Sequence, residues 1–206
     1  MSWKPETEEI AKRRDLAKAQ GGPDAVARQH EKGRLTIRER IDALIDEGSF
    51  DEIGEGAGSA ERGENGELLE FSPANFVLGF ARVHGRRVVV GGEDFTLKGG
   101  SPSPAGLRKS VYTEDLAVQH RVPLIRLHEG AGGSVGGSGG PSLPGPVFAP
   151  SRFRSVAEAM ATLPVATAAM GAVAGLPAAR LVSSHFSVMS KTTAQVLVAG
   201  PAVVER

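Results

Sequence analysis

The first fifty residues are polar and charged, with hydrophobic residues spaced as on one face of a helix. Thr36 followed by Glu39 forms a capping box, which predicts that a helix begins there. Gly48 is expected to end this helix, and a second helix is predicted over residues 6–20. The apolar stripe of the capped helix consists of Ile37, Ile41, Leu44 and Ile45. We therefore expect residues 1–50 to form a helical arm that packs on the main body or on a neighbour.

From residue 51 onward the pattern changes to short strands. A polar stretch over 54–67 is typical of a surface loop, and apolar residues then alternate over 75–83 and return over 87–90, which predicts a hairpin. The later predicted elements are a strand at 93–97, a helix at 106–120, a strand at 122–127, a helix near 152–161, strands at 164–170 and 181–189, and a further element starting at 192–198. Strand pairs followed by helices predict an α/β superhelix of ββα repeats over residues 51–206, rather than a doubly wound sheet.

Two of the apolar strands lead into glycine turns. The strand at 122–127 continues into 130–133, and the strand at 164–170 continues into 171–177. Glycine lets a backbone approach a ligand closely and adopt positive φ, and a turn that opens a helix leaves N–H groups without intrahelical partners. If the two turns fold side by side, their N–H groups can point at one oxygen. Such an oxyanion hole stabilises negative charge that develops on a carbonyl.

Composition excludes several classes of function. The 24 basic and 24 acidic residues cancel, so nothing favours binding to nucleic acid or to an anionic membrane. Cysteine is absent, which excludes disulfides, thiolate metal sites and a cysteine nucleophile, and the five histidines show no metal-ligand spacing. No apolar run approaches the roughly 20 residues of a transmembrane helix, and the charged N-terminus is unlike a signal peptide. We therefore expect a cytoplasmic enzyme without a metal.

The glycine run at 130–140 fits no phosphate-binding motif. No lysine follows it before Lys191, and Val135 takes the place of the third glycine of a dinucleotide fingerprint. Ser138 fits the nucleophile-elbow pattern G-x-S-x-G, but the prolines after it oppose the required strand–turn–helix context. A glycine loop without function would not explain the matching second turn.

Four blocks of the sequence resemble, in the same order, the carboxyltransferase (β) subunits of biotin-dependent acyl-CoA carboxylases, the propionyl-CoA and methylcrotonyl-CoA carboxylase group. The blocks lie at 33–50, 94–117, 170–175 and 199–204. The resemblance implies a crotonase-like fold. Because family members have two crotonase-like halves, this chain resembles the N-terminal half. We therefore expect residues 51–206 to form the N-terminal carboxyltransferase domain, truncated at its C-terminal end.

Both glycine turns depart from the common family pattern. The common first turn is Asp-Ser-Gly-Gly-Ala, whereas this chain has Glu-Gly-Ala-Gly-Gly-Ser from Glu129 onward. The common second turn has two adjacent glycines, whereas here Leu176 and Pro177 follow Gly175. Proline fits the first turn of a helix, so backbone donation at Gly175 and Leu176 survives. The acyl pocket is expected to be reshaped.

The resemblance implies a reaction in which CO₂ moves from carboxybiotin to the α-carbon of an acyl-CoA through an enolate, with the biotin ureido nitrogen as the base. In this interpretation Gly175 and Leu176 donate N–H groups to the enolate, and Gly132 and Gly133 shape the opposite wall. Three further residues are expected to line the substrate site, and two basic residues are candidates for contact with CoA phosphates. The lining residues are Glu129, Gly130 and Ala174, and the basic residues are Lys109 and Arg108.

The partners implied by the resemblance are a biotin carboxylase and biotin carboxyl carrier subunit, the C-terminal carboxyltransferase half, and further copies of the chain in a hexamer. Two alternatives stay open. A stand-alone crotonase-type hydratase or decarboxylase would need a carboxylate or histidine in the pocket, for which Glu129 and His128 are the nearest candidates. A non-catalytic half-domain that scaffolds an assembly would bind no acyl-CoA.

Overall fold

A seven-stranded sheet organises the protein. A computed structural model describes residues 3–133 and 153–199, so Ser138 and the glycines around it lie outside the described residues. The strand order is β1-β4-β5-β6-β7-β8, with β9 also beside β7, and β5 to β8 run parallel. Because this order follows the chain, the sheet lacks the reversal of a doubly wound fold. The strands are β1 (Asp51–Glu52), β4 (Phe76–Val83), β5 (Arg86–Glu93), β6 (Leu124–Gly130), β7 (Val165–Ala174), β8 (Phe186–Met189) and β9 (Gln195–Leu197).

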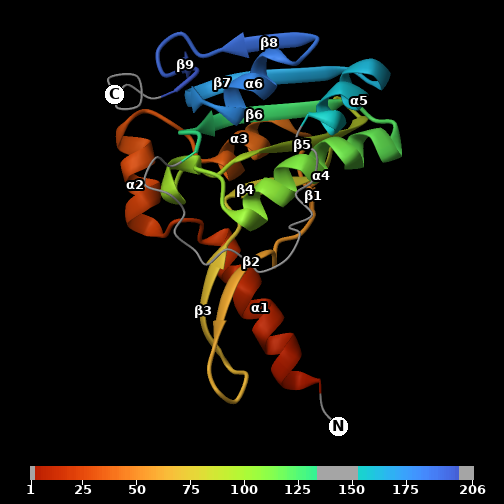
Figure 1. Cartoon of the computed structure of the whole chain (residues 1–206). Helices are drawn as coiled ribbons and strands as arrows, with labels where there is room; N and C mark the ends of the chain where they lie inside the picture. The colour runs from red at the N-terminus through yellow and green to blue at the C-terminus, as the bar shows by residue number, and fades with distance from the viewer. Residues whose placement is uncertain (1–2, 134–152, 200–206) are drawn as a thin grey trace.

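Helices cover both faces of the sheet (Figure 1). On one face, Leu116 of α4 and Ala159 of α5 pack with Val89 in a buried cluster. On the other face, Ile37 and Ile41 of α3 pack with strand residues that include Val90. Successive strand residues thus enter different cores, as the pleat of a strand requires. The helices are α3 (Ile37–Leu44), α4 (Pro104–His120), α5 (Arg154–Thr162) and α6 (Leu176–Val182).

The capping box is confirmed. The Thr36 hydroxyl accepts from the Glu39 N–H, and the Glu39 carboxylate accepts from the Thr36 N–H. Ile37 and Ile41 are buried on the predicted apolar stripe. The helix ends at Leu44 rather than near Gly48, because Ile45 is already extended.

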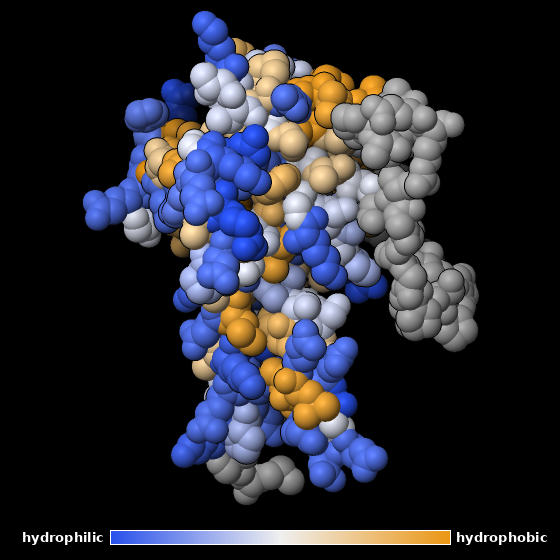
Figure 2. Space-filling view, turned by 90° about the vertical axis from the view of Figure 1, so that its left-hand side faces the viewer, coloured by the Kyte–Doolittle hydropathy of each residue, from blue (hydrophilic) through white to orange (hydrophobic). Residues whose placement is uncertain are grey.

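The N-terminal helix and a hairpin project together from the sheet (Figure 1). Helix α1 (Lys4–Lys18) lies beside strands β2 (Gly58–Arg62) and β3 (Leu68–Pro73), and Arg62 pairs with Glu9 at 2.6 Å. Most residues of this projection are hydrophilic (Figure 2).

The predicted loop at 54–67 is wrong because it contains strand β2, and helix α2 (Pro23–Glu31) was not predicted. Every residue of β2 is exposed, so no alternation of polar and apolar residues marks the strand.

Several predicted strand boundaries are also wrong. β6 and β7 continue beyond their predicted ends, so Glu129 and Gly171 belong to strands rather than to turns. The strand predicted at 93–97 is instead the end of β5 followed by a turn. Residues 181–182 close helix α6, and β8 begins only at Phe186.

A buried carboxylate joins α4, β6 and α6. Glu114 Oε1 lies 2.7 Å from Arg126 Nη2 and 2.8 Å from Arg180 Nε. Arg126 also donates to the Ser110 carbonyl at 2.6 Å, and its burial lowers its pKa to about 10. One carboxylate therefore compensates two buried guanidinium groups, and it fixes α6 against α4.

We expect Glu114→Ala to lower the free energy of unfolding by about 3–5 kcal/mol, because it leaves two buried arginines without their shared carboxylate. Asp115→Ala is the matched control on the exposed side of the same helix. It should change the free energy by about 0.5 kcal/mol or less. Urea unfolding followed by circular dichroism measures both variants. Equal losses would show that the buried triad contributes no special stability.

Candidate functional site

The two glycine turns lie in backbone contact at one edge of the sheet. They follow the neighbouring parallel strands β6 and β7, which rejoin at Gly130 opposite Val173. A Cβ on Gly132 would lie 2.9 Å from the Ala174 carbonyl oxygen, and one on Gly175 would lie 3.4 Å from the Gly132 Cα. Both glycines have positive φ, +78° and +64° respectively. The predicted juxtaposition of the turns is confirmed, and it depends on residues without side chains.

The turns differ in which N–H groups they leave available. Gly175 donates its N–H to the Val198 carbonyl at 3.1 Å, so this predicted donor already has a partner. Leu176 is the first residue of α6, where a helix offers no internal acceptor. Its N–H, like those of Gly132 and Gly133, makes no hydrogen bond to any other described residue. These three groups are the backbone donors that the two turns can offer to a ligand.

Neighbouring segments hold both turns in place. The Ala131 N–H donates to the Gly99 carbonyl at 2.9 Å, within the short 3₁₀ helix η1 (Lys98–Gly100). The Ser101 hydroxyl donates to the Gly132 carbonyl at 2.6 Å. A Cβ on Gly130 would lie 3.3 Å from Pro177 Cγ, so the first turn of α6 packs directly on Gly130. The first glycine turn is therefore supported by η1 and by the start of α6.

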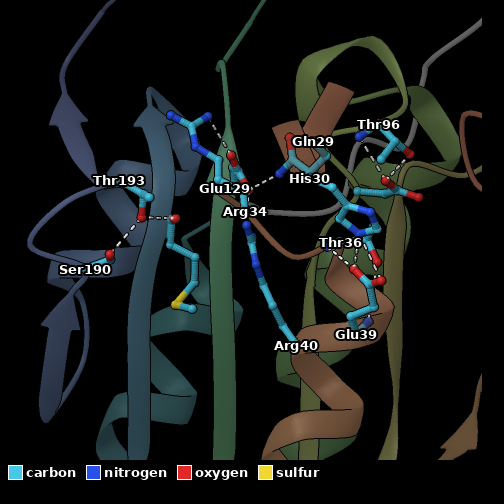
Figure 3. Close-up of polar contacts among 12 residues, drawn as sticks. Gln29, His30, Arg34, Thr36, Glu39, Arg40, Thr96, Glu129, Ser190 and Thr193 are labelled. Atoms are coloured by element: carbon cyan, nitrogen blue, oxygen red, sulfur yellow. Dashed lines mark hydrogen bonds and ion pairs between the residues drawn. The ribbon is translucent and has the colours of Figure 1, made fainter. Parts of the chain in front are cut away.

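Glu129 is buried and bound by the N-terminal arm (Figure 3). Gln29 Nε2 donates to Oε2 at 2.8 Å, Arg34 Nη1 donates to Oε1 at 3.1 Å, and Arg40 also pairs with Oε2. Both carboxylate oxygens thus have partners within the protein. Glu129 was expected to line the substrate site, whereas in this structure it joins the arm to β6.

A second buried pair, Glu93 and His128, was not predicted. His128 Nδ1 lies 3.1 Å from Glu93 Oε2, while His128 Nε2 makes no hydrogen bond to a described residue. Burial raises the pKa of Glu93, but the nearby His128 and Arg126 outweigh it, so this pKa stays below its ordinary value. Glu93 also lines a cavity of about 20 Å³ beside Leu176, which is enough space for one water molecule. The partners are 35 positions apart in the sequence, so this pair leaves no local signal there.

The two basic candidates on α4 are placed differently. Lys109 is buried, donates to the Gly54 carbonyl at 3.2 Å and lies 3.9 Å from the Glu52 carboxylate. Burial lowers the pKa of Lys109 to about 8. Arg108 is exposed. The structure therefore brings together the glycine-turn residues, whereas Lys109 is engaged in a separate ion pair.

Other features of the described residues lie outside this site. A hollow of about 810 Å³ lies between α1 and the β2–β3 hairpin, lined by charged residues that include Glu9, Arg13 and Arg62. Within 3–133 and 153–199, no group of three His, Asp or Glu side chains could hold a metal ion. In the same ranges, no helix has the length and apolar character needed to span a membrane.

Curated relatives match nearly the whole chain. Residues 28–206 match the carboxyl transferase domain family. The chain is 34% identical over 200 residues to the propionyl-CoA carboxylase beta chain of Cereibacter sphaeroides, covering 96% of this chain and 38% of that protein. It is 35% identical over 199 residues to the biotin-dependent acetyl-/propionyl-coenzyme A carboxylase beta5 subunit of Mycobacterium tuberculosis, covering 96% of this chain and 35% of that protein. The chain thus spans less than two fifths of the length of these relatives.

Solved structures confirm the predicted crotonase-like α/β fold. A single-chain, multi-domain long-chain acyl-CoA carboxylase matches with a TM-score of 0.76 at 30% identity, covering 97% of this chain and 20% of that chain. Transcarboxylase 12S, described as a hexamer, matches with a TM-score of 0.72 at 25% identity, covering 100% of this chain and 39% of that chain. The chain belongs to the carboxyl transferase domain family, together with the β subunits of biotin-dependent acyl-CoA carboxylases that its sequence resembles.

Proposed function

We propose that this chain forms the acyl-CoA-binding part of a carboxyltransferase that moves CO₂ from carboxybiotin to the α-carbon of an acyl-CoA. Family membership supports the reaction class. The observation that carries the proposal is the backbone contact of Gly132 with Ala174 and Gly175, which gathers glycine-turn N–H groups at one edge of the sheet. This edge lies at the carboxyl ends of the parallel strands β6 and β7.

The proposed chemistry needs stabilisation of one developing charge. When the α-proton leaves an acyl thioester, negative charge moves onto the thioester oxygen. The N–H groups of Leu176, Gly132 and Gly133 are the donors that we assign to this oxygen. Each preorganised donor of this kind contributes about 3–4 kcal/mol to the stability of the transition state. When bound, carboxybiotin carried on a partner subunit would supply the CO₂ that the enolate carbon attacks, and its ureido nitrogen, left without the carboxyl group, would take the α-proton.

Gly175 has a supporting role in this proposal. Its N–H donates to Val198, so it fixes the turn rather than contacting the oxygen. Its φ of +64° and ψ of −126° direct the chain into α6, so that the next N–H, from Leu176, becomes available. On α4, Arg108 is the exposed basic residue that we assign to CoA phosphates.

The partners that we propose are the rest of the carboxyltransferase, further copies of the chain, and the subunits that carboxylate and carry biotin. Strand β8 exposes Phe186, Val188 and Met189, and Val198 after β9 is 93% exposed. Hydrophobic residues also gather at the top of the view in Figure 2, where β8 and β9 lie in Figure 1. Relatives of more than twice this length would have further structure to cover such a surface.

We expect Gly175→Val to lower turnover about a hundredfold in the complete carboxyltransferase, the scale of losing one oxyanion donor. Valine strongly disfavours the positive φ, and its side chain would press on Gly132 across the contact between the turns. Steady-state carboxyl transfer from carboxybiotin measures the effect.

Gly48→Val is the matched control for this substitution. Gly48 has a φ of +68°, similar to that of Gly175, but a Cβ there would meet nothing within 4 Å. It therefore carries the same backbone strain away from the turns. Equal losses of turnover in the two folded variants would contradict the assignment of the second turn to the oxyanion site.

We expect the 206-residue chain alone to form no carboxylated product from acyl-CoA and carboxybiotin, because it spans only 38% of a relative's length. The assay follows carboxylated CoA thioester by mass spectrometry, with and without the remaining part of the carboxyltransferase. Product from the chain alone would contradict this expectation. Hydration or decarboxylation of acyl-CoA without biotin would instead favour the stand-alone crotonase-type enzyme. Its carboxylate would then be Glu93, which lies beside Leu176 and pairs with His128, rather than the expected Glu129, whose oxygens are bound by the arm.

A further inference from the structure

The side chain of Glu129 lies where the pairing of β6 with β7 is interrupted. His128 pairs with Ala169 and Gly130 pairs with Val173, so the register shifts across Glu129. The backbone ladder gives this residue no regular partner on β7, although the first glycine turn starts directly after it. Strand pairing brings the turn beside β7 at Gly130, so support for the residue directly before the turn has to come from its side-chain contacts.

Contacts from the arm supply that support. Gln29 lies in α2, Arg40 lies in α3, and Arg34 lies in the segment between them, and all three bind the Glu129 carboxylate (Figure 3). The Arg40 side chain is 4% exposed and that of Glu129 is 0% exposed. Because a buried carboxylate is strongly destabilised without partners, this pair constrains the position of both residues.

The opposite side of the carboxylate is closed by β7. A Cβ on Gly171 would collide with the Glu129 carboxylate, so the strand passes close only because residue 171 has no side chain. The carboxylate is therefore held between the arm on one side and the backbone of β7 on the other. Movement of the arm would be transmitted to the residue that precedes the glycine turn.

We propose that Arg40 and Glu129 are positioning residues through which the N-terminal arm holds the first glycine turn against the second. A comparison with Arg38 separates this positioning role from general anchoring of the arm on the sheet. Arg38 lies on the same helix as Arg40 and forms a two-bond ion pair, at 2.6 Å and 3.0 Å, with Glu52 of β1. Arg38 fixes α3 without contacting β6. The catalytic consequence rests on the proposed function, whereas the positioning itself can be measured without catalysis.

The experiment compares Arg40→Met, Gly171→Ala and the matched control Arg38→Met. The first readout is hydrogen exchange of the Ala131 amide, measured by NMR, because its bond to Gly99 reports the geometry of the first turn. We expect exchange about tenfold faster in Arg40→Met and Gly171→Ala, which perturb the carboxylate from opposite sides, and little change in Arg38→Met. If Arg40→Met fails to fold, Gly171→Ala and Arg40→Lys decide the result.

The second readout is steady-state kinetics of the complete carboxyltransferase. We expect kcat to fall about a hundredfold with little change in KM for Arg40→Met and Gly171→Ala, since a small misplacement of catalytic groups has effects of that size. Equal effects of Arg40→Met and Arg38→Met on Ala131 exchange and on kcat would overturn the proposal. If the variants show the expected exchange pattern but the complete protein catalyses no carboxyl transfer, the positioning role stands and the proposed function is refuted.

Discussion

Parallel strands that lie side by side in one sheet end at the same edge, and β6 and β7 are such a pair. Each strand leads into a glycine turn, so their pairing sets where the two turns meet. Side chains at Gly132 or Gly175 would separate them. The supports around the turns, η1 on one side and α6 on the other, are useful only because the sheet first brings the two backbones together.

Charged side chains are buried on both faces of β6. Arg126 and His128 point toward the α4 face, where Glu114 and Glu93 are their partners. Glu129 points toward the arm. Buried ion pairs contribute little net stability compared with apolar packing, yet removal of one partner is strongly destabilising. Each buried charge on β6 therefore restricts which element can pack against the strand, because that element must supply the matching partner.

Features that depend on residues close together in the sequence could be predicted, whereas features that depend on residues far apart in the sequence could not. The capping box at Thr36 and the glycine turns depend on neighbours along the chain, so both were predicted. The end of β6 was placed too early because the polar residues His128 and Glu129 follow the apolar run, and that of β7 because Gly171 was interpreted as the start of a turn. Glu129 is buried through a residue as distant as Gln29, which is 100 residues away. The bond from Gly175 to Val198 likewise joins separate elements, so the engaged donor could not be recognised beforehand.

The absence of a side chain at Gly171 also bears on how this family can diverge. The space that a methyl group would occupy is filled by the carboxylate of Glu129. A relative with a shorter residue at the position of Glu129 would leave that space open and could accept alanine or serine at the position of Gly171. The two positions form a pair matched in volume across neighbouring strands. Substitutions at them are therefore expected to covary, and the basic residue at the position of Arg40 to be lost when the carboxylate is lost.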